Sequence, residues 1–275
     1  MLWSVGLRYL RKGHGEPALI FVHDLLCTHD DWRHQLEHFE RSHAVLALDL
    51  RGHGQSTAFE DGFDIPTLGA DVATLVRDLD LGPVVLLGHG LGARVVLQAA
   101  TTLGPAVRAL VLVDGGRLAS GSALGAVERA REQVERIGIA RLLDQLIVAA
   151  TSNPGNESQR ALVAERARRI PEAVLESLWY SIAHWDAGRL DDALRAVSVP
   201  LLVLQSTYLN ANRVRVPAHT HATNPWFEII GRHVPDARIQ IIGGAGHFGI
   251  VDAPAAVNRC LATFLADVTQ RAFFR

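Results

Sequence analysis

The sequence has few cysteines, no long apolar run and no excess of one charge. Its 275 residues include only two cysteines, Cys27 and Cys260, and 27 lysine and arginine residues stand against 29 aspartate and glutamate residues. Two cysteines so far apart do not form a disulfide framework, which favours a reducing compartment, and we expect a cytoplasmic location. The balanced charge argues against a nucleic-acid partner or an anionic membrane surface.

Two further absences concern membranes. No apolar run approaches the roughly 18 residues of a membrane helix. The first eleven residues lack the basic stretch and apolar core of a signal peptide, so we expect none. The expected partner is a small-molecule substrate, and the expected assembly is a monomer or a homodimer.

What the sequence does contain is a regular alternation of apolar runs and amphipathic stretches. Hydrophobic residues make up 48% of the chain, enough for a large core. Runs at 18–22, 44–50, 84–87, 109–113 and 200–204 are typical of strands buried on both faces, and helical spacing separates most of them. This pattern predicts an α/β fold with a mostly parallel sheet, helices on both faces and sites at the carboxyl ends of the strands.

The most informative stretch follows the run at 84–87 and reads Gly88-His89-Gly90-Leu91-Gly92. A strand, a glycine-rich turn and a helix in this order are the context of a nucleophile elbow, G-x-S-x-G. Gly88 and Gly92 remove side chains that would collide with the strained turn. However, the central residue is Gly90, which has no side chain with which to attack a substrate.

Together with three other motifs, this stretch resembles the α/β-hydrolase superfamily. The motifs are His23-Asp24-Leu25 after the first buried run, Asp49-x-Arg51-Gly52-His53-Gly54-x-Ser56, and Gly243-Gly244-Ala245-Gly246-His247-Phe248 near the end. The resemblance covers nearly the whole chain. It implies a core of residues 1–114 and 195–275, an inserted helical cap of residues 115–194, and no cofactor or metal.

The resemblance also assigns roles to residues. It places His247 at the position of the catalytic base. An imidazole suits this role because it can shuttle protons near neutral pH. The family's usual acid follows the strand at 201–204, but residues 193–227 contain no Asp or Glu. We therefore expect Asp114, at the end of the preceding strand, to orient His247. Asn210 is the alternative, through a neutral hydrogen bond.

The remaining predicted site residues bind rather than transfer protons. The backbone N–H groups of Leu25 and Leu91 are expected to form an oxyanion hole, although Asp24 stands where the family usually has glycine. His89, Trp179, Trp185 and Phe248 are the predicted substrate contacts. Cys27 is a possible thiol nucleophile, but a buried small residue is the simpler interpretation.

Three hypotheses account for the missing serine. The chain is a hydrolase of small neutral or hydrophobic esters or lactones whose serine has been replaced, so that Gly90→Ser would restore acyl transfer. Alternatively, it is a serine-independent lyase or cofactor-independent oxygenase that uses His247 as a base. In the third hypothesis it binds a ligand without catalysis. The fold alone cannot choose among them.

Overall fold

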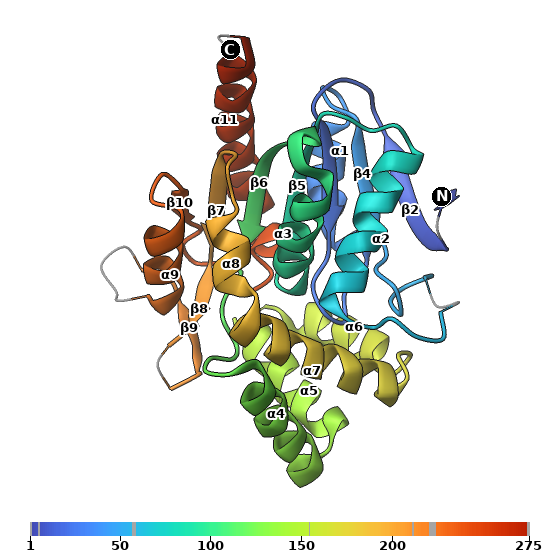
Figure 1. Ribbon diagram of the computed structural model, residues 1–275, viewed down its shortest axis with the longest axis vertical. Coiled ribbons are helices and arrows are strands. Elements are labelled where there is room, and N and C mark those ends of the chain that lie inside the picture. The colour runs from blue at the N-terminus through green and yellow to red at the C-terminus, as the bar shows by residue number, and fades with distance from the viewer. Residues whose placement is uncertain are drawn as a thin grey trace.

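The centre of the molecule is an eight-stranded, mostly parallel sheet. The computed structural model describes residues 2–4, 6–56, 59–153, 155–210, 212–219 and 224–273. The strand order is β1–β2–β4–β3–β5–β6–β7–β10 (Figure 1). Neighbours from β4 to β10 run parallel, whereas β2 pairs antiparallel with both β1 and β4. The bounds are β1 (Leu2–Ser4), β2 (Leu7–Lys12), β3 (Ala18–Val22), β4 (Val45–Leu48), β5 (Val84–His89), β6 (Val107–Val113), β7 (Leu201–Gln205) and β10 (Arg238–Ile241).

The central strands form where the sequence predicts them, because they are apolar on both faces. Every residue of β3, β4, β5 and β7 is buried. Successive side chains of one strand enter different cores: Ile20 belongs to one apolar cluster, and Leu19 and Phe21 belong to the other. Such strands need helices on both sides, as in a parallel α/β sheet.

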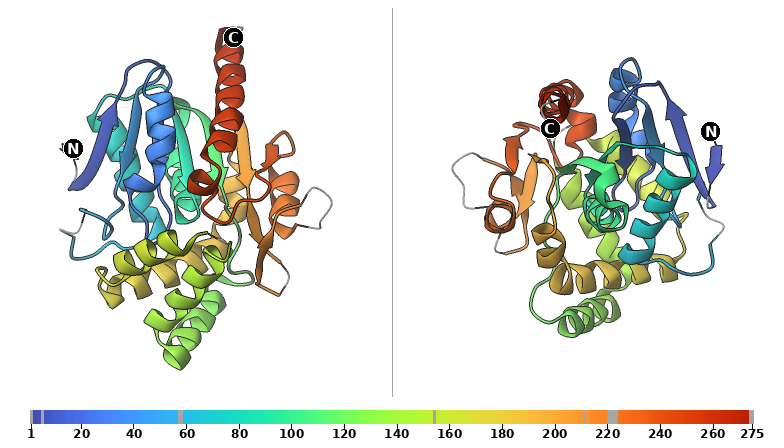
Figure 2. Two further views of the ribbon diagram at one scale, coloured as in Figure 1. Left: turned by 180° about the vertical axis from the view of Figure 1, so that it is seen from behind. Right: turned by 45° about the horizontal axis from the view of Figure 1, so that its top comes forward.

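Helices cover both faces of this sheet. In one core α2, α3 and α8 pack, and in the other α1 and α11 contribute Leu36 and Leu261 (Figure 2). The helix bounds are η1 (His29–Trp32), α1 (Arg33–Phe39), α2 (Ile65–Asp78), α3 (Leu91–Leu103), η2 (Gly104–Ala106), α4 (Ala123–Ile137), α5 (Ile139–Ala150), α6 (Glu157–Ala167), α7 (Glu172–Gly188), α8 (Leu190–Arg195), α9 (Pro225–His233), α10 (Gly249–Asp252) and α11 (Pro254–Phe273). No helix in the described residues is long and apolar enough to cross a membrane.

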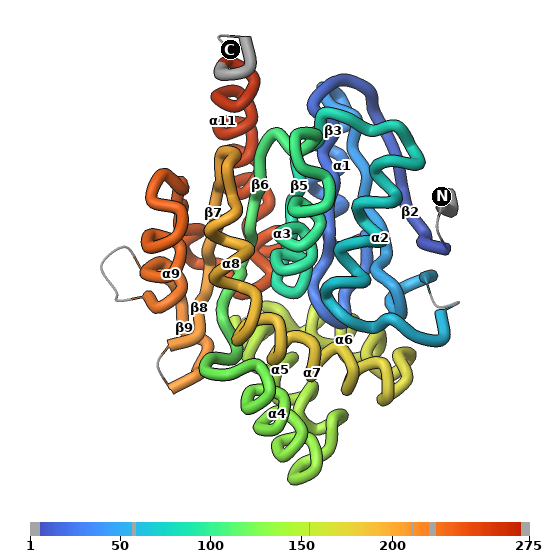
Figure 3. The backbone as a smooth tube through the Cα atoms, viewed as in Figure 1, coloured from blue at the N-terminus to red at the C-terminus, as the bar shows by residue number. Residues whose placement is uncertain are grey.

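Between β6 and β7 the chain leaves the sheet and forms a group of helices. Figure 3 shows that α4–α7 gather beyond one end of the strands before α8 leads back to β7. Side chains from α5, α6 and α7 line a cavity whose opposite wall includes Asp24 and His247. These helices therefore roof the carboxyl ends of the strands.

After β7 the chain forms a short hairpin that the sequence analysis does not predict. Residues Thr207–Leu209 (β8) and Arg215–Pro217 (β9) pair antiparallel, with Tyr208 opposite Val216, as a separate two-stranded sheet. This hairpin brings the Arg215 side chain to the ends of the main strands. The sequence offered no strong signal for it, because both strands have only three residues.

Candidate active site

The elbow between β5 and α3 has the predicted geometry. Gly90 has φ +52° and ψ −107°, a region that L side chains rarely adopt. A Cβ on Gly92 would lie 2.3 Å from the carbonyl oxygen of Val22, so the helix can approach β3 only with glycine there. The turn therefore presents the point at which a nucleophile would stand, with Gly90 at its apex.

That point is filled by the carboxylate of Asp24. A Cβ built on Gly90 would lie 2.0 Å from Oδ1 and 2.4 Å from Oδ2 of Asp24. The Leu91 N–H donates to Oδ1 at 2.5 Å, and His247 Nε2 lies 2.8 Å from Oδ2. An aspartate from the loop after β3 thus occupies the space that an elbow side chain would need.

Local hydrogen bonds fix Asp24 in this place. The Leu50 N–H donates to His23 Nε2 at 2.9 Å, so the ring hydrogen of a neutral His23 is on Nδ1. His23 Nδ1 then donates to the Asp24 carbonyl at 2.7 Å. Burial opposes the charge on Asp24. The hydrogen bond from His247, electrostatic interactions with His247 and His89, and the Leu91 N–H outweigh burial and hold the carboxyl pKa well below its usual range.

His247 lies where the sequence predicts, after β10, and both of its ring nitrogens are occupied. Nε2 faces Asp24, and Arg215 Nη1 lies 2.9 Å from Nδ1. Burial and the Arg215 charge lower the His247 pKa to about 3. In this arrangement neither ring nitrogen offers a free lone pair, so the geometry gives no support to His247 as a general base.

The predicted hydrogen bond between Asp114 and His247 is not formed. Asp114 Oδ1 accepts the N–H groups of Ser206 at 3.0 Å and Thr207 at 2.8 Å, while Oδ2 has no partner among the described residues. Burial raises the Asp114 pKa to about 6 despite these donors. The acid fails to reach His247 because the turn after β7 binds its carboxylate.

The structure also gives no support to Asn210 as the group that orients His247 or to Cys27 as a nucleophile. Asn210 Oδ1 accepts the N–H groups of Asn212 and Val214 inside the β8–β9 turn, and does not orient His247. Cys27 is buried, and burial raises its pKa well above the usual thiol value, which disfavours the reactive thiolate.

The two predicted oxyanion donors have different positions. The Leu91 N–H is already bonded to Asp24, so it cannot serve a substrate oxygen while Asp24 remains there. Leu25 lines the cavity beside Asp24. An acyl-transfer site therefore lacks both its nucleophile and one of its two predicted donors.

The cavity has a volume of about 150 Å³ and a mainly apolar roof. Of the predicted substrate contacts, Trp179 and Phe248 line it. His89 and Trp185 do not: His89 is fully buried with Nε2 2.8 Å from the His247 carbonyl oxygen, and the Trp185 Nε1–H donates to Gln98. These two side chains support the framework.

A buried ion pair joins the elbow to the cap. Arg94 in the first turn of α3 donates both Nε and Nη2 to Asp186 of α7 at 2.7 Å, and Nη1 donates to the Gly90 carbonyl at 3.1 Å. This bidentate geometry is the strong form of an Arg–carboxylate contact. It fixes the cap helix relative to the elbow.

Asp24, His89 and His247 offer ligand atoms within 4.8 Å of one another. However, Arg215 takes the lone pair of His247 Nδ1, which leaves the hydrogen of a neutral ring on Nε2, the nitrogen that faces Asp24. These residues do not fit a metal in this arrangement.

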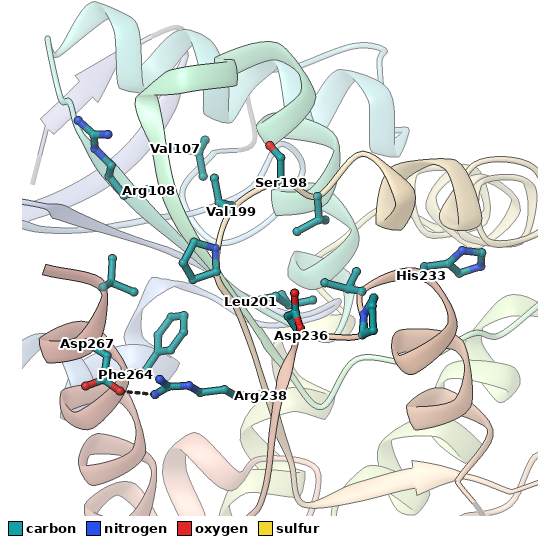
Figure 4. A pocket seen from close by; sticks show the side chains of 15 residues that line it. Val107, Arg108, Ser198, Val199, Leu201, His233, Asp236, Arg238, Phe264 and Asp267 are labelled. Atoms are coloured by element: carbon teal, nitrogen blue, oxygen red, sulfur yellow. Dashed lines mark hydrogen bonds and ion pairs between the residues drawn. The ribbon is translucent and has the colours of Figure 1, made fainter. Parts of the chain in front are cut away.

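A larger pocket, of about 450 Å³, lies elsewhere and contains none of the candidate residues. Val107, Leu201 and Arg238 place it at the amino ends of β6, β7 and β10 (Figure 4). Ligands of parallel α/β sheets bind at the carboxyl ends, so the smaller cavity is the candidate site.

The chain belongs to the alpha/beta hydrolase family, whose family model matches residues 19–259. It is 24% identical over 267 residues to a 2-(acetamidomethylene)succinate hydrolase of Mesorhizobium japonicum, an alignment that covers 95% of this chain and 92% of that protein. It is 31% identical over 107 residues to an (E)-2-((N-methylformamido)methylene)succinate hydrolase of Acinetobacter baylyi, covering 39% of this chain and 40% of that protein. A match to mouse epoxide hydrolase 4, 31% identical over 114 residues, covers 40% of this chain and 32% of that protein. The expected family and fold are therefore confirmed.

The relatives named above are hydrolases, which supports a hydrolase in general. Their names do not say what reaction a site with Gly90 at the elbow carries out. Sequence reasoning missed Asp24 as the occupant of the nucleophile position. A signal was present: aspartate stands where the family has glycine, and glycine stands where it has serine. Arg215 was missed because its hairpin was not predicted.

Proposed function

We propose that this chain is a hydrolase that uses the Asp24 carboxylate, in place of a serine, as its nucleophile. The proposed substrate is a small, mainly apolar molecule with an electrophilic saturated carbon, such as an epoxide. The observation that carries the proposal is the position of Asp24, whose oxygens lie 2.0 and 2.4 Å from where a Gly90 Cβ would stand.

This position argues against ester or lactone hydrolysis by serine-type acyl transfer. A tetrahedral oxyanion needs free N–H donors, and the Leu91 N–H is bonded to Asp24. Serine attack also needs a base, and both nitrogens of His247 are occupied. Attack on a saturated carbon needs neither an oxyanion hole nor a base for its first step.

The chemistry of Asp24 suits such an attack. Its lowered pKa keeps the carboxylate ionised, and Leu91 and His247 orient its two oxygens. In the first step an Asp24 oxygen bonds to an epoxide carbon, the ring C–O bond breaks, and the ring oxygen takes the electron pair and then a proton from water. In the second step the hydroxide left by that water attacks the Asp24 carboxyl carbon, and the Leu91 N–H binds Oδ1 where negative charge develops. The bond between the carboxyl carbon and the diol oxygen then breaks, and this oxygen takes the proton of the new carboxyl group. One water is consumed and a diol and the carboxylate are released.

The cavity supports a small and mostly uncharged substrate. Its roof includes Leu143, Ile147, Val163 and Ile182, and its volume is about 150 Å³. Arg213 and Arg215 also line it and could stabilise the oxygen that becomes negative when the ring opens. The relative named epoxide hydrolase 4 adds support from sequence, over part of the chain.

The proposal is tested with propylene oxide and styrene oxide as probes. We expect diol formation, and a rapid quench should give a peptide containing Asp24 with the mass of the added epoxide. Asp24→Asn should lose both signals, whereas Asp191→Asn, an acid paired with Arg117 outside the cavity, should keep them.

Two results would overturn the proposal. One is the absence of both diol and adduct in the intact protein. The other is solvent-deuterium uptake into a carbon acid that depends on Asp24 without any adduct, which would assign proton abstraction to this carboxylate instead.

A further inference from the structure

We propose that Arg215 is a positioning residue that keeps His247 neutral and confines its ring hydrogen to Nε2. His247 then serves as a permanent hydrogen-bond donor to Asp24. This inference deepens the proposed function and rests on it for its purpose, but its test needs no substrate.

The first step is the placement of the guanidinium. Arg215 begins β9, and its Nη1 is 2.9 Å from Thr207 Oγ1 on the paired strand β8 and 2.9 Å from His247 Nδ1. Thr207 in turn donates its N–H to Asp114 at 2.8 Å. The hairpin therefore holds Arg215 against the histidine by contacts on both of its strands.

The second step follows from the inventory of donors. A guanidinium has N–H donors and no acceptor, so the Nδ1 atom that faces it must accept. The single hydrogen of a neutral ring is then on Nε2, which points at Asp24 Oδ2 at 2.8 Å. A second proton would have to sit on Nδ1, against a cation, where both the missing acceptor and like-charge repulsion oppose it.

The third step is the comparison with an ordinary triad. A carboxylate on Nδ1 accepts the ring hydrogen there and leaves Nε2 free to act as a base. Arg215 reverses this polarity, because it donates where a carboxylate would accept. The same ring in the same place thereby changes from a base to a donor.

The purpose follows from the charge on Asp24. An imidazolium would orient Asp24 but would also neutralise its charge, whereas a neutral imidazole orients the carboxylate and leaves its charge available for attack. The charged and titratable groups that face His247 are Asp24 from the β3 loop, His89 from β5 and Arg215 from β9. Of these, Arg215 and His89 oppose a proton on His247 and Asp24 favours one.

The test is the titration of His247 by NMR of protein labelled with ¹⁵N-histidine. The titration runs from neutral pH to about pH 3, and in the intact protein we expect a neutral ring with hydrogen on Nε2 down to about pH 4. Arg215→Met should free Nδ1 for a second proton, and the pKa of His247 should rise by about one unit or more, giving an imidazolium paired with Asp24. Arg215→Lys restores a cationic donor and should keep the ring neutral.

Arg213→Met serves as the control, because Arg213 lines the same cavity without a hydrogen bond to His247 among the described contacts. Its His247 titration should match that of the intact protein, and circular dichroism should show that all variants are folded. An imidazolium in the intact protein at pH 6 would overturn the inference. An unchanged titration in folded Arg215→Met would also overturn it, whether or not Asp24 proves to be a nucleophile.

Discussion

The site has an elbow half, formed by Gly90, Leu91 and Asp24, and a histidine half, formed by His247 and Arg215. The two halves differ from the expected α/β-hydrolase site in different ways. At the elbow, Gly90 has no side chain, and the Asp24 carboxylate fills the space that an elbow side chain would occupy. At the histidine, His247 keeps its place, but Arg215 stands where a carboxylate was expected. The first exchange keeps a reactive group at one point, and the second changes what the neighbouring ring can do.

The largest expected effect is on the elbow half. We expect Asp24→Asn to lower kcat for epoxide hydrolysis by a factor on the order of 10⁴ or more, because an amide is no nucleophile and loss of a covalent nucleophile has costs of that size. Steady-state rates of diol formation measure it. A loss of less than tenfold would show that Asp24 only supports the site.

The second prediction concerns the stability of variants at the elbow. Gly90→Ser places a Cβ 2.0 Å from Asp24 Oδ1 at a φ of +52°, so we expect it to lower the free energy of unfolding by about 2–4 kcal/mol. Urea denaturation measures the change. In Asp24→Gly/Gly90→Ser the carboxylate is gone, and more than half of the loss should return. If the double variant instead loses the sum of the unfolding free energies lost by the two single variants, the side chains at positions 24 and 90 do not compete for the same space.

The same double variant separates the two halves. It has an elbow serine and a free Leu91 N–H, yet we expect no burst of acyl-enzyme with short aryl esters, because Arg215 still holds His247 as a donor. Stopped-flow release of the aryl alcohol is the measurement. A burst that disappears on a further His247→Ala change would show that the ring can act as a base beside Arg215.

The sequence predicted the scaffold well because the scaffold depends on local signals. The buried runs of β3 and β5 and the glycines around residue 90 are constrained by neighbours in the chain and by close backbone contacts. The contacts of the Asp24 and Arg215 side chains with His247 depend instead on segments far apart in the chain. The two side chains meet His247 from residues 223 and 32 positions away, and no local pattern encodes which distant side chain fills a space.

The expected hydrogen bond between Asp114 and His247 is wrong for a similar reason. Asp114 ends a strand beside the site and lines the cavity. Its carboxylate, however, binds the N–H groups of Ser206 and Thr207, which a sequence does not show.

Asp114 gives a smaller, pH-dependent effect. Its folded-state pKa of about 6 lies above its unfolded value of 3.8, so its contribution to stability is complete below about pH 4 and is lost as the pH rises through 6. Asp114→Asn removes this loss. Relative to the intact protein, we expect the free energy of unfolding of Asp114→Asn to increase by an amount that grows between pH 4 and 7 and reaches at most about 3 kcal/mol. Thermal unfolding across this pH range measures it, and a variant that is least stable relative to the intact protein at pH 8 would contradict it.

The smallest expected effect is an absence of change. Because the His247 pKa is about 3, kcat/KM should show no ionisation of His247 between pH 5 and 8. A limb near pH 6 that vanishes in Asp114→Asn belongs to Asp114. A limb near pH 6.5 that persists in that variant would indicate a titrating His247 and an incorrect account of the histidine half.

The central claim is that Asp24 reacts from the position of the missing elbow side chain. The most direct test is a single turnover of an epoxide in H₂¹⁸O, followed by mass spectrometry of the peptide that contains Asp24 and of the diol. We predict ¹⁸O in the Asp24 carboxylate and unlabelled oxygen in the first diol, because water attacks the carboxyl carbon. A diol that carries ¹⁸O, together with an unlabelled Asp24, would contradict the claim.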